Sequence, residues 1–136
     1  MTQRTLVLLK PDTVRRGLVG EVLSRYEAKG LTIVEMDQRV IDGATADRHY
    51  AEHLQRDFYP LLREFITSGP SVALVLEGDQ AVDIVRLING ATDGRKAAPG
   101  TIRGDLSLSN TENMVHGSDS LESAEREIAI FFPALT

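Results

Sequence analysis

The chain has 136 residues, enough for one domain with a single sizeable core, and no repeat, linker or low-complexity segment divides it. A net charge of −5 argues against a protein held to nucleic acid by a basic surface, and the absence of cysteine excludes disulfides, thiol chemistry and a cysteine metal site. No apolar run approaches the ~18 residues that span a bilayer. The N-terminus lacks the apolar core of a signal peptide, so we expect a cytoplasmic protein.

Two strand patterns flank a helix pattern in the first forty residues. The continuous apolar run 5–9 is typical of a strand buried on both faces, and Lys10 follows it directly. That lysine is either the point where the chain reaches the surface or a cation held at the strand end, where open α/β sheets bind ligands. Apolar spacing predicts an amphipathic helix over 14–26, which Gly17 could interrupt, and partial alternation predicts a strand over 31–41.

The middle of the chain shows helix patterns around one more buried strand. We expect a helix over 44–53, then a second helix that Asp57 caps, with Pro60 in its first turn. The apolar run 72–76 predicts a third strand, and apolar spacing over 81–88 predicts another helix.

The last third begins with residues 91–111, which show no period. A loop of about twenty residues in so compact a domain is uncommon and usually functional. A short strand then carries His116 to a tight glycine turn before a helix over 120–132. This order of elements predicts an α+β fold, a ferredoxin-like α/β sandwich whose four-stranded antiparallel sheet is covered by helices. Its first and last strands could be neighbours, which would place Lys10 near His116.

His116 is the main candidate for chemistry. At a helix mouth it should be exposed, oriented and close to backbone N–H groups that favour anions. Neutral imidazole is a usable nucleophile at cell pH. Glu127 falls on the side of the last helix that borders the core, where it could accept a hydrogen bond from the far nitrogen of His116 and fix its tautomer. The alternative is a glutamate at the rim of the core, paired with Arg126 or a lysine.

Phosphate binding would have to come from side chains, because no P-loop motif is present. Arg86 lies in an otherwise apolar helix, and Arg103 lies in a loop flanked by glycines. Each alone is as consistent with an ordinary surface arginine as with a phosphate ligand. With Lys10 they supply three cations that suit phosphate oxygens.

The segment from His49 to His53 matches the H-x-x-E-H motif of some zinc proteases. Two histidines four residues apart share a helix face and could hold zinc. Short motifs also recur by chance, and no third ligand stands out. We therefore expect exposed helix histidines here rather than a metal site, with Tyr50 the more important residue.

Four segments together resemble nucleoside diphosphate kinases. The resemblance runs from Thr5 to Phe132 without an evident gap, which implies a single nucleoside diphosphate kinase domain over 1–136. The segments are Thr-Leu-Val-Leu-Leu-Lys-Pro-Asp at 5–12, Ile-Thr-Ser-Gly-Pro at 66–70, Pro-Gly-Thr-Ile-Arg-Gly-Asp at 99–105 and Asn-Met-Val-His-Gly-Ser-Asp at 113–119.

The resemblance implies a ping-pong transfer of the γ-phosphate of a nucleoside triphosphate to a nucleoside diphosphate, with broad base tolerance. Nδ1 of His116 would carry the phosphoryl group between the two half-reactions. Mg²⁺ would be bound through the nucleotide phosphates, since the sequence shows no carboxylate cage for it. The alternatives are a nucleotide-binding sensor or scaffold without turnover, and nucleic-acid binding, which the acidic charge disfavours.

The resemblance also implies roles for individual residues. Ser118 and Glu127 would orient the histidine, and Tyr50 would line the pocket beside it. Lys10 would contact the transferred phosphate and the sugar hydroxyl. The remaining nucleotide contacts implied are base stacking on Phe58, phosphate binding by Arg86, Thr92 and Arg103, and a hydrogen bond between Asn113 and the ribose 3′-hydroxyl.

Three positions depart from the family pattern. Thr13 stands where many members have glycine or alanine, and Asp57 replaces a proline; both should change local stiffness only. Gly94 stands where the long loop, which members use at subunit contacts, often has a proline. The chain also ends soon after Phe132, without the tail that some relatives wrap onto a neighbour. We expect a homo-oligomer, with a hexamer favoured over a tetramer.

Overall fold

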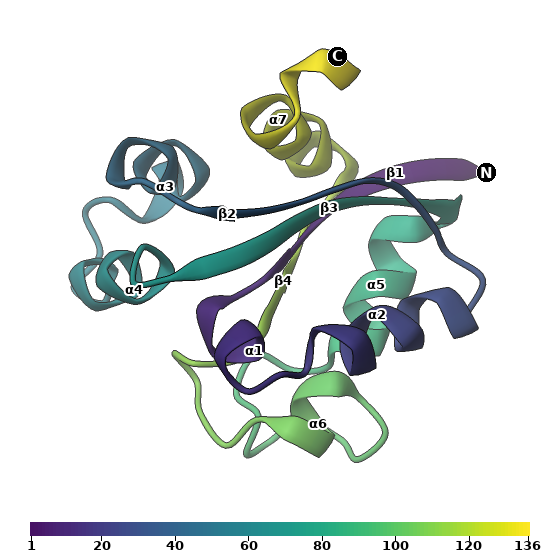
Figure 1. Ribbon diagram of the computed structural model, residues 1–136, viewed down its shortest axis with the longest axis horizontal. Coiled ribbons are helices and arrows are strands. Elements are labelled where there is room, and N and C mark those ends of the chain that lie inside the picture. The colour runs from purple at the N-terminus through teal and green to yellow at the C-terminus, as the bar shows by residue number, and fades with distance from the viewer.

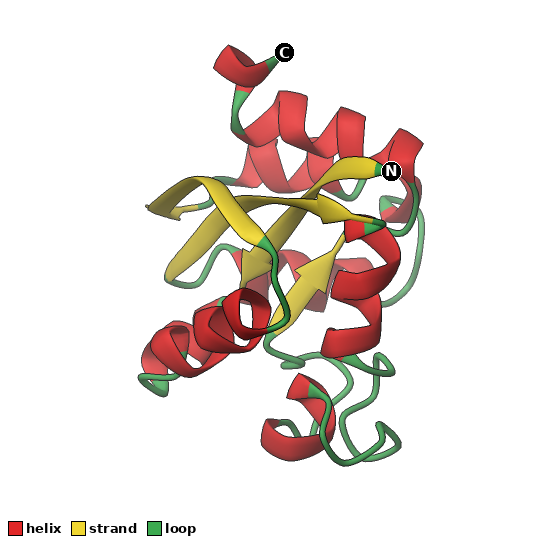
Figure 2. Cartoon of the chain, turned by 90° about the vertical axis from the view of Figure 1, so that its right-hand side faces the viewer, coloured by secondary structure: helices red, strands yellow, loops and turns green.

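The protein is built on one antiparallel sheet with the strand order β2-β3-β1-β4 (Figure 1). The computed structural model describes residues 1–136. Helices cover both faces of the sheet, as the turned view in Figure 2 shows, so the predicted ferredoxin-like sandwich is confirmed. The strands are β1 (Thr2–Leu9), β2 (Thr32–Val40), β3 (Pro70–Asp79) and β4 (Val115–Gly117).

Seven α-helices and two short 3₁₀ helices connect these strands. The α-helices are α1 (Pro11–Arg15), α2 (Val19–Ala28), α3 (Gly43–His49), α4 (Tyr59–Ile66), α5 (Ala81–Asn89), α6 (Ile102–Leu106) and α7 (Leu121–Phe131). The 3₁₀ helices are η1 (Ala51–His53) and η2 (Pro133–Leu135). Helices α2 and α5 cover one face of the sheet, while α3, α4 and α7 cover the other (Figure 1). No helix combines the length and the apolar character needed to cross a membrane.

The core lies on both faces of the central strand β1, which explains its unbroken apolar run. Val7 and Leu9 pack against α2 and α5, whereas Leu6 and Leu8 pack against α3, α4 and α7. All four side chains are fully buried. A strand that has helices on both faces needs apolar residues at successive positions rather than at alternate ones.

Glycine and capping residues set the ends of several helices. The predicted helix over 14–26 is interrupted at Gly17, which adopts a φ of +69°, so α1 and α2 are separate. The predicted Asp57 cap is wrong, because α4 begins after Phe58 and has no side-chain cap. Asp42 is a true cap, since its carboxylate accepts a hydrogen bond from the backbone N–H of Thr45 at the start of α3.

The segment 91–111 is not wholly irregular, because it contains α6. The hydroxyl of Thr101 caps that helix by accepting from the N–H of Gly104. Gly94 is buried, and a Cβ there would collide with the backbone of Ser107. Glycine at this departure from the family pattern therefore permits close packing within the loop.

Strand β4 pairs with β1 in the register Leu8 to His116, so the first and last strands are neighbours as predicted. The predicted tight turn at Gly117 is wrong, because this glycine is the last residue of β4. A Cβ at Gly117 would lie 2.9 Å from Val85 Cγ1, so its role is to let α5 approach the strand closely. Ser120 then caps α7 by accepting from the N–H of Ser123.

Candidate active site

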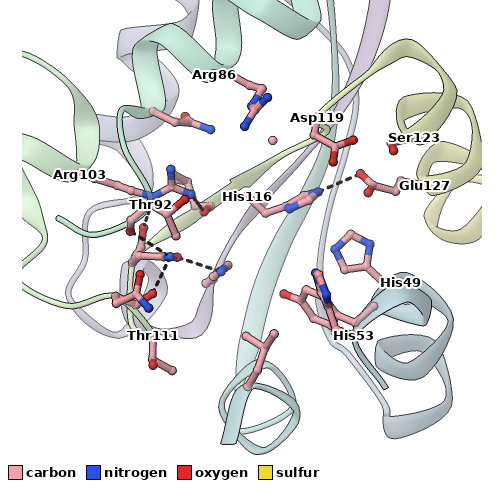
Figure 3. Close-up of a pocket in the computed structure, with 18 of the residues that line it drawn as sticks. His49, His53, Arg86, Thr92, Arg103, Thr111, His116, Asp119, Ser123 and Glu127 are labelled. Atoms are coloured by element: carbon pink, nitrogen blue, oxygen red, sulfur yellow. Dashed lines mark hydrogen bonds and ion pairs between the residues drawn. The ribbon is translucent and has the colours of Figure 1, made fainter. Parts of the chain in front are cut away.

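A cavity of about 490 Å³ opens at the end of the sheet where β1 and β4 meet α3, α5 and α7. Nine of the ten predicted site residues line it, and the tenth, Ser118, lies behind Glu127. Figure 3 shows His116 between two groups of side chains, with Glu127 and His49 on one side and Arg103 and Thr92 on the other. Segments distant in sequence thus place basic and nucleophilic groups around one space.

The His116 ring is held by a buried carboxylate. Its Nε2 lies 2.8 Å from Oε1 of Glu127, and Ser118 Oγ donates to the same oxygen at 2.7 Å. Because a carboxylate only accepts hydrogen bonds, Nε2 carries the ring proton and Nδ1 keeps the lone pair. The side chain of His116 is 20% exposed, so the histidine is partly buried rather than exposed as the sequence suggested.

Glu127 combines both arrangements considered from the sequence. It bonds His116 through Oε1, and its Oε2 lies 3.6 Å from Nη2 of Arg126. The hydroxyl of Ser118 is fully buried and also accepts from the N–H of Leu6, which ties this group to β1. The carboxylate is therefore fixed before any ligand binds.

Lys10 and Asn113 form a second fixed pair at the floor of the cavity. Nζ of Lys10 donates to Oδ1 of Asn113 at 2.9 Å, and the amide of Asn113 donates to the carbonyls of Thr92 and Asn110. Burial, aided by the nearby Arg103 cation, lowers the pKa of Lys10 to about 8. Lys10 is thus a buried cation at the end of its strand and not a residue at the surface.

Arg103 and Arg86 differ in what they can offer an anion. Arg103 is buried and donates to the backbone carbonyls of Asn113, Gly90 and Val115 at 3.1, 2.8 and 2.6 Å. Three of its five N–H groups are thereby committed to the chain, and two remain. Arg86 is exposed and lines the cavity from α5 (Figure 3). Arg86 is consequently the freer donor for an anion, while Arg103 fixes the backbone around β4.

His49 is a site residue that sequence reasoning missed. It is only 4% exposed, and its ring meets the His116 ring edge-on, with centroids 4.6 Å apart. Neither of its ring nitrogens has a hydrogen-bond partner, and burial, followed by the nearby His116, lowers its pKa well below the usual value. The expectation of exposed histidines is wrong here because α3 turns Ala46 and His49 inward, together with Tyr50 directly after it. Their i, i+3, i+4 spacing was the available signal.

Tyr50 and Phe58 form the aromatic wall of the cavity. Tyr50 is 8% exposed, its hydroxyl has no partner, and burial, then the charge of Glu127, raises its pKa. Phe58 is 50% exposed at the rim, with its ring 5.4 Å from that of His53. Phe58 therefore offers a ring surface at the mouth, while Tyr50 closes the inner side.

A strained residue positions the loop that leads into β4. Met114 adopts a φ of +72°, a left-handed conformation that is uncommon for a residue other than glycine. Its carbonyl accepts from the N–H of Lys10 at 2.8 Å and from the hydroxyl of Thr13 at 2.7 Å. Thr13 therefore does more than alter local stiffness, because it bonds the loop between Asn113 and His116.

One family model matches nearly the whole chain. The model of nucleoside diphosphate kinases matches residues 3–136. The chain belongs to the nucleoside diphosphate kinase family. A nucleoside diphosphate kinase of Nocardioides sp. strain JS614 is 76% identical over 135 residues, which cover 99% of this chain and 100% of the relative. That of Rhodococcus erythropolis is 62% identical, covering 100% of this chain and 99% of the relative.

Solved structures of nucleoside diphosphate kinases have the same fold. The enzyme of Halobacterium salinarum, solved in complex with CDP, has a TM-score of 0.95 and 48% identity, covering 97% of this chain and 88% of that chain. The Aquifex aeolicus enzyme also has a TM-score of 0.95, at 39% identity, covering 99% of this chain and 98% of that one. The predicted family, its enzyme class of nucleotide phosphotransferases and the predicted fold are all confirmed.

Proposed function

We propose that the chain moves the γ-phosphate of a nucleoside triphosphate to a nucleoside diphosphate in two steps, with His116 as the intermediate carrier. The observation that carries this proposal is the 2.8 Å contact between Nε2 of His116 and Glu127, which leaves the lone pair on Nδ1. A neutral, oriented imidazole beside several cations suits attack on a phosphoryl group.

In the first step, the Nδ1 lone pair of His116 attacks the γ-phosphorus. A P–N bond forms while the bond to the β-phosphate oxygen breaks, and the diphosphate leaves with that electron pair. In the second step, a terminal phosphate oxygen of another diphosphate attacks the same phosphorus and the P–N bond breaks. In both steps the proton stays on Nε2, which donates its hydrogen bond to Glu127, and the carboxylate stabilises the positive charge that develops on the ring. Positioning and charge neutralisation supply the catalysis.

The cations around the cavity suit the nucleotide phosphates. Arg86 reaches the cavity with its guanidinium free of carbonyl contacts, and Arg103 keeps two N–H groups for a ligand. Lys10 would contact the transferred phosphate and the sugar hydroxyl, and Thr92 would add a hydroxyl contact. Tyr50 would bound the phosphoryl group beside the histidine.

The nucleoside would bind toward the rim. Phe58, half-exposed at the mouth, offers a ring face for base stacking, and stacking accepts any base because every base has a π-face. Asn113, bonded to Lys10, would meet the ribose 3′-hydroxyl. This arrangement supports broad base tolerance.

Mg²⁺ fits this site only as an ion carried by the nucleotide. The cavity presents Lys10, Arg86, Arg103 and Arg126 and no cluster of three carboxylates, whereas Mg²⁺ prefers an octahedral shell of oxygens. When bound with the nucleotide, the ion would neutralise part of the phosphate charge, and Lys10, Arg86 and Arg103 would add to that effect.

Covalent labelling tests the proposal. Incubation with γ-labelled ATP should give an acid-labile phosphoprotein whose label maps to His116, and His116→Ala should take up none. A wild-type protein that binds nucleotide but acquires no label would instead support the sensor or scaffold alternative. Transfer from labelled ATP to a second diphosphate then measures turnover, and a mobility shift that persists at physiological salt would revive nucleic-acid binding.

We also propose that this single 1–136 domain is cytoplasmic and assembles into a homo-oligomer, with a hexamer favoured over a tetramer. Strand β2 lies at the sheet edge, and Met36 and Val40 on it are 46% and 61% exposed. An unpaired strand edge favours association with another chain, and exposed apolar side chains on it add to that tendency. Sedimentation velocity should give the mass of six chains, and Val40→Lys should shift the population to smaller species. A wild-type monomer would contradict the assembly.

A further inference from the structure

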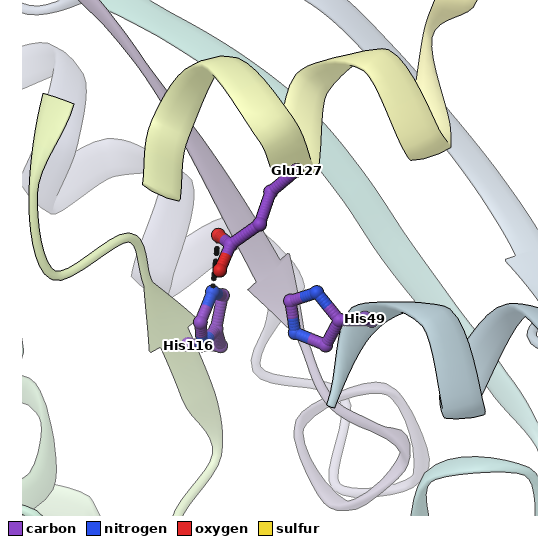
Figure 4. A group of neighbouring side chains, drawn as sticks. All are labelled: His49, His116 and Glu127. Atoms are coloured by element: carbon purple, nitrogen blue, oxygen red, sulfur yellow. Dashed lines mark hydrogen bonds and ion pairs between the residues drawn. The ribbon is translucent and has the colours of Figure 1, made fainter. Parts of the chain in front are cut away.

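Three potential metal ligands meet beside the cavity. His49 comes from α3, His116 from β4 and Glu127 from α7, and Figure 4 shows their side chains converging. One ligand atom of each lies within 4.8 Å of the others. No other group of three such residues occurs, in a chain with three histidines and no cysteine. The H-x-x-E-H motif contributes only His49 to this cluster.

His49 indicates a ligand site because its ring nitrogens have no hydrogen-bond partner in the protein. The residue is 96% buried, both ring nitrogens lack a hydrogen-bond partner, and the ring meets that of His116. A buried polar group without a partner destabilises the fold, so a species that engages such a nitrogen is favoured at this position. No part of the proposed phosphoryl transfer uses these nitrogens.

The ligand types indicate which ion would bind. Two imidazole nitrogens and one carboxylate oxygen are the set that zinc takes in sites with an open fourth position. Mg²⁺ and Ca²⁺ prefer oxygen ligands throughout, so they should not bind this cluster. Imidazole suits the late first-row dications, among which zinc is redox-inert.

We propose that His49, His116 and Glu127 bind Zn²⁺, and that the bound ion blocks phosphorylation of His116. The claim that zinc blocks phosphorylation rests on the proposed function, because it requires His116 to be the phosphoryl carrier. The claim that zinc binds rests on the cluster alone. Ligand atoms of a tetrahedral zinc lie about 3.3 Å apart at zinc–nitrogen distances of about 2.0–2.1 Å, so small side-chain rotations would close the site.

Metal binding and phosphorylation compete for one lone pair. A neutral imidazole has one protonated nitrogen and one lone pair. If the ion takes Nδ1 of His116, it occupies the phosphoryl position directly. If it takes Nε2, it replaces the hydrogen bond to Glu127, and the ring proton moves to Nδ1. Neither case leaves a nucleophile, and neither requires an oxidant or a reductant.

The surrounding charges limit the affinity. Lys10 and Arg126 lie close enough to His49 to act on its charge, and they would repel a dication. Binding should therefore be weaker than in a structural zinc site closed by four ligands. ATP itself binds metal ions, so binding has to be measured without nucleotide.

Calorimetric titration of metal-free protein tests whether the cluster binds Zn²⁺. We expect one Zn²⁺ per chain and no heat from Mg²⁺. His49→Phe keeps the ring and its packing but removes both nitrogens. It should weaken Zn²⁺ binding at least ~100-fold, since losing even an outer partner of a zinc ligand costs about 10–100-fold. His49→Gln provides a second test if the phenylalanine variant does not fold, and His53→Gln, from the same motif but outside the cluster, should bind as wild type. No Zn²⁺ binding by wild type, or equal binding by the His49 variants, would overturn the proposal.

Uptake of phosphate label tests whether bound Zn²⁺ prevents phosphorylation of His116. Protein loaded with Zn²⁺ is exposed briefly to γ-labelled ATP with excess Mg²⁺, and each variant is compared with its own metal-free rate. Zinc should suppress labelling of wild type but not of the folded His49 variant. Equal suppression in both would show inhibition at another place and overturn the proposal. If metal-free wild type takes up no label, the proposed function fails, while the titration still decides whether the zinc site exists.

Discussion

The Glu127→Gln substitution tests the charge of the carboxylate that holds the His116 ring. In the native site, Oε1 of Glu127 accepts hydrogen bonds from both His116 and Ser118. An amide oxygen in the same place can accept both, so geometry and packing are kept. The substitution removes the negative charge opposite the developing imidazolium, and with it the attraction between Oε2 and Nη2 of Arg126, which lie 3.6 Å apart.

The size of the effect follows from the type of hydrogen bond. A hydrogen bond to a charged group contributes about 1.5–3 kcal/mol, and one between neutral groups about 0.5–1.5 kcal/mol. The difference, roughly 1–2 kcal/mol, applies mainly to the transition state, where the ring becomes positive. At about 1.36 kcal/mol per tenfold change in rate, phosphorylation of His116 should slow by about 5–30-fold.

Rapid-quench measurement of label transfer from γ-labelled ATP gives this rate in a single turnover. The chain has no tryptophan, so the label is a more direct reporter than intrinsic fluorescence. Glu125→Gln makes the same chemical change at an exposed position on α7 and should leave the rate unaltered. If Glu127→Gln reacts as fast as wild type while folded, the carboxylate only orients the ring and the electrostatic reasoning is refuted.

Three further substitutions or titrations address neighbouring groups. Because the pKa of Lys10 is lowered to about 8, its cation is lost as pH rises through that value, so kcat/KM for ATP should fall above about pH 8. The unfolded chain keeps that proton up to about pH 10.5, so the free energy of unfolding should rise with pH in the same window; a flat kcat/KM profile would contradict the assignment. Arg103→Lys loses at least two of three carbonyl contacts and should lower the free energy of unfolding in urea by about 3 kcal/mol. Thr13→Ala removes the hydrogen bond from the hydroxyl to the Met114 carbonyl and should lower the free energy of unfolding by about 1 kcal/mol in the same assay. No change would mean that this hydrogen bond does not stabilise the fold.

The fold could be predicted wherever burial imposes a pattern. The run 5–9 predicted β1 because both faces of that strand are buried, but residues 2–4 of the strand are more exposed and carry no such signal. Helix α6 escaped prediction because five residues are too few to show a period, and its start depends on the Thr101 cap. Asp57 was assigned as a cap from its residue type alone, whereas α4 starts two residues later.

The site was predictable as far as strand order and helix faces determine it. Glu127 lies on the buried stripe of α7, and the pairing of β1 with β4 brings Lys10 toward His116. The contacts of Arg103 with backbone carbonyls depend on the path of a loop without periodicity, so residue type suggested only a surface arginine or a phosphate ligand. His49 was missed because both histidines of the motif were expected to be exposed, whereas the inward face of α3 buries His49.

The pairing of β4 with β1 has a consequence for the protein during its synthesis. Strand β4 is three residues long and has β1 as its only neighbour in the sheet. Leu8 and His116, opposite each other in that pairing, are 108 positions apart in the sequence. A ribosome makes Lys10 and the arginine of α5 well before it makes the histidine, and β1 can pair with β3 in the meantime. Contacts between such distant positions form late because a long loop must close first. The growing chain should therefore form most of its sheet and much of its core before it gains His116, the proposed nucleophile.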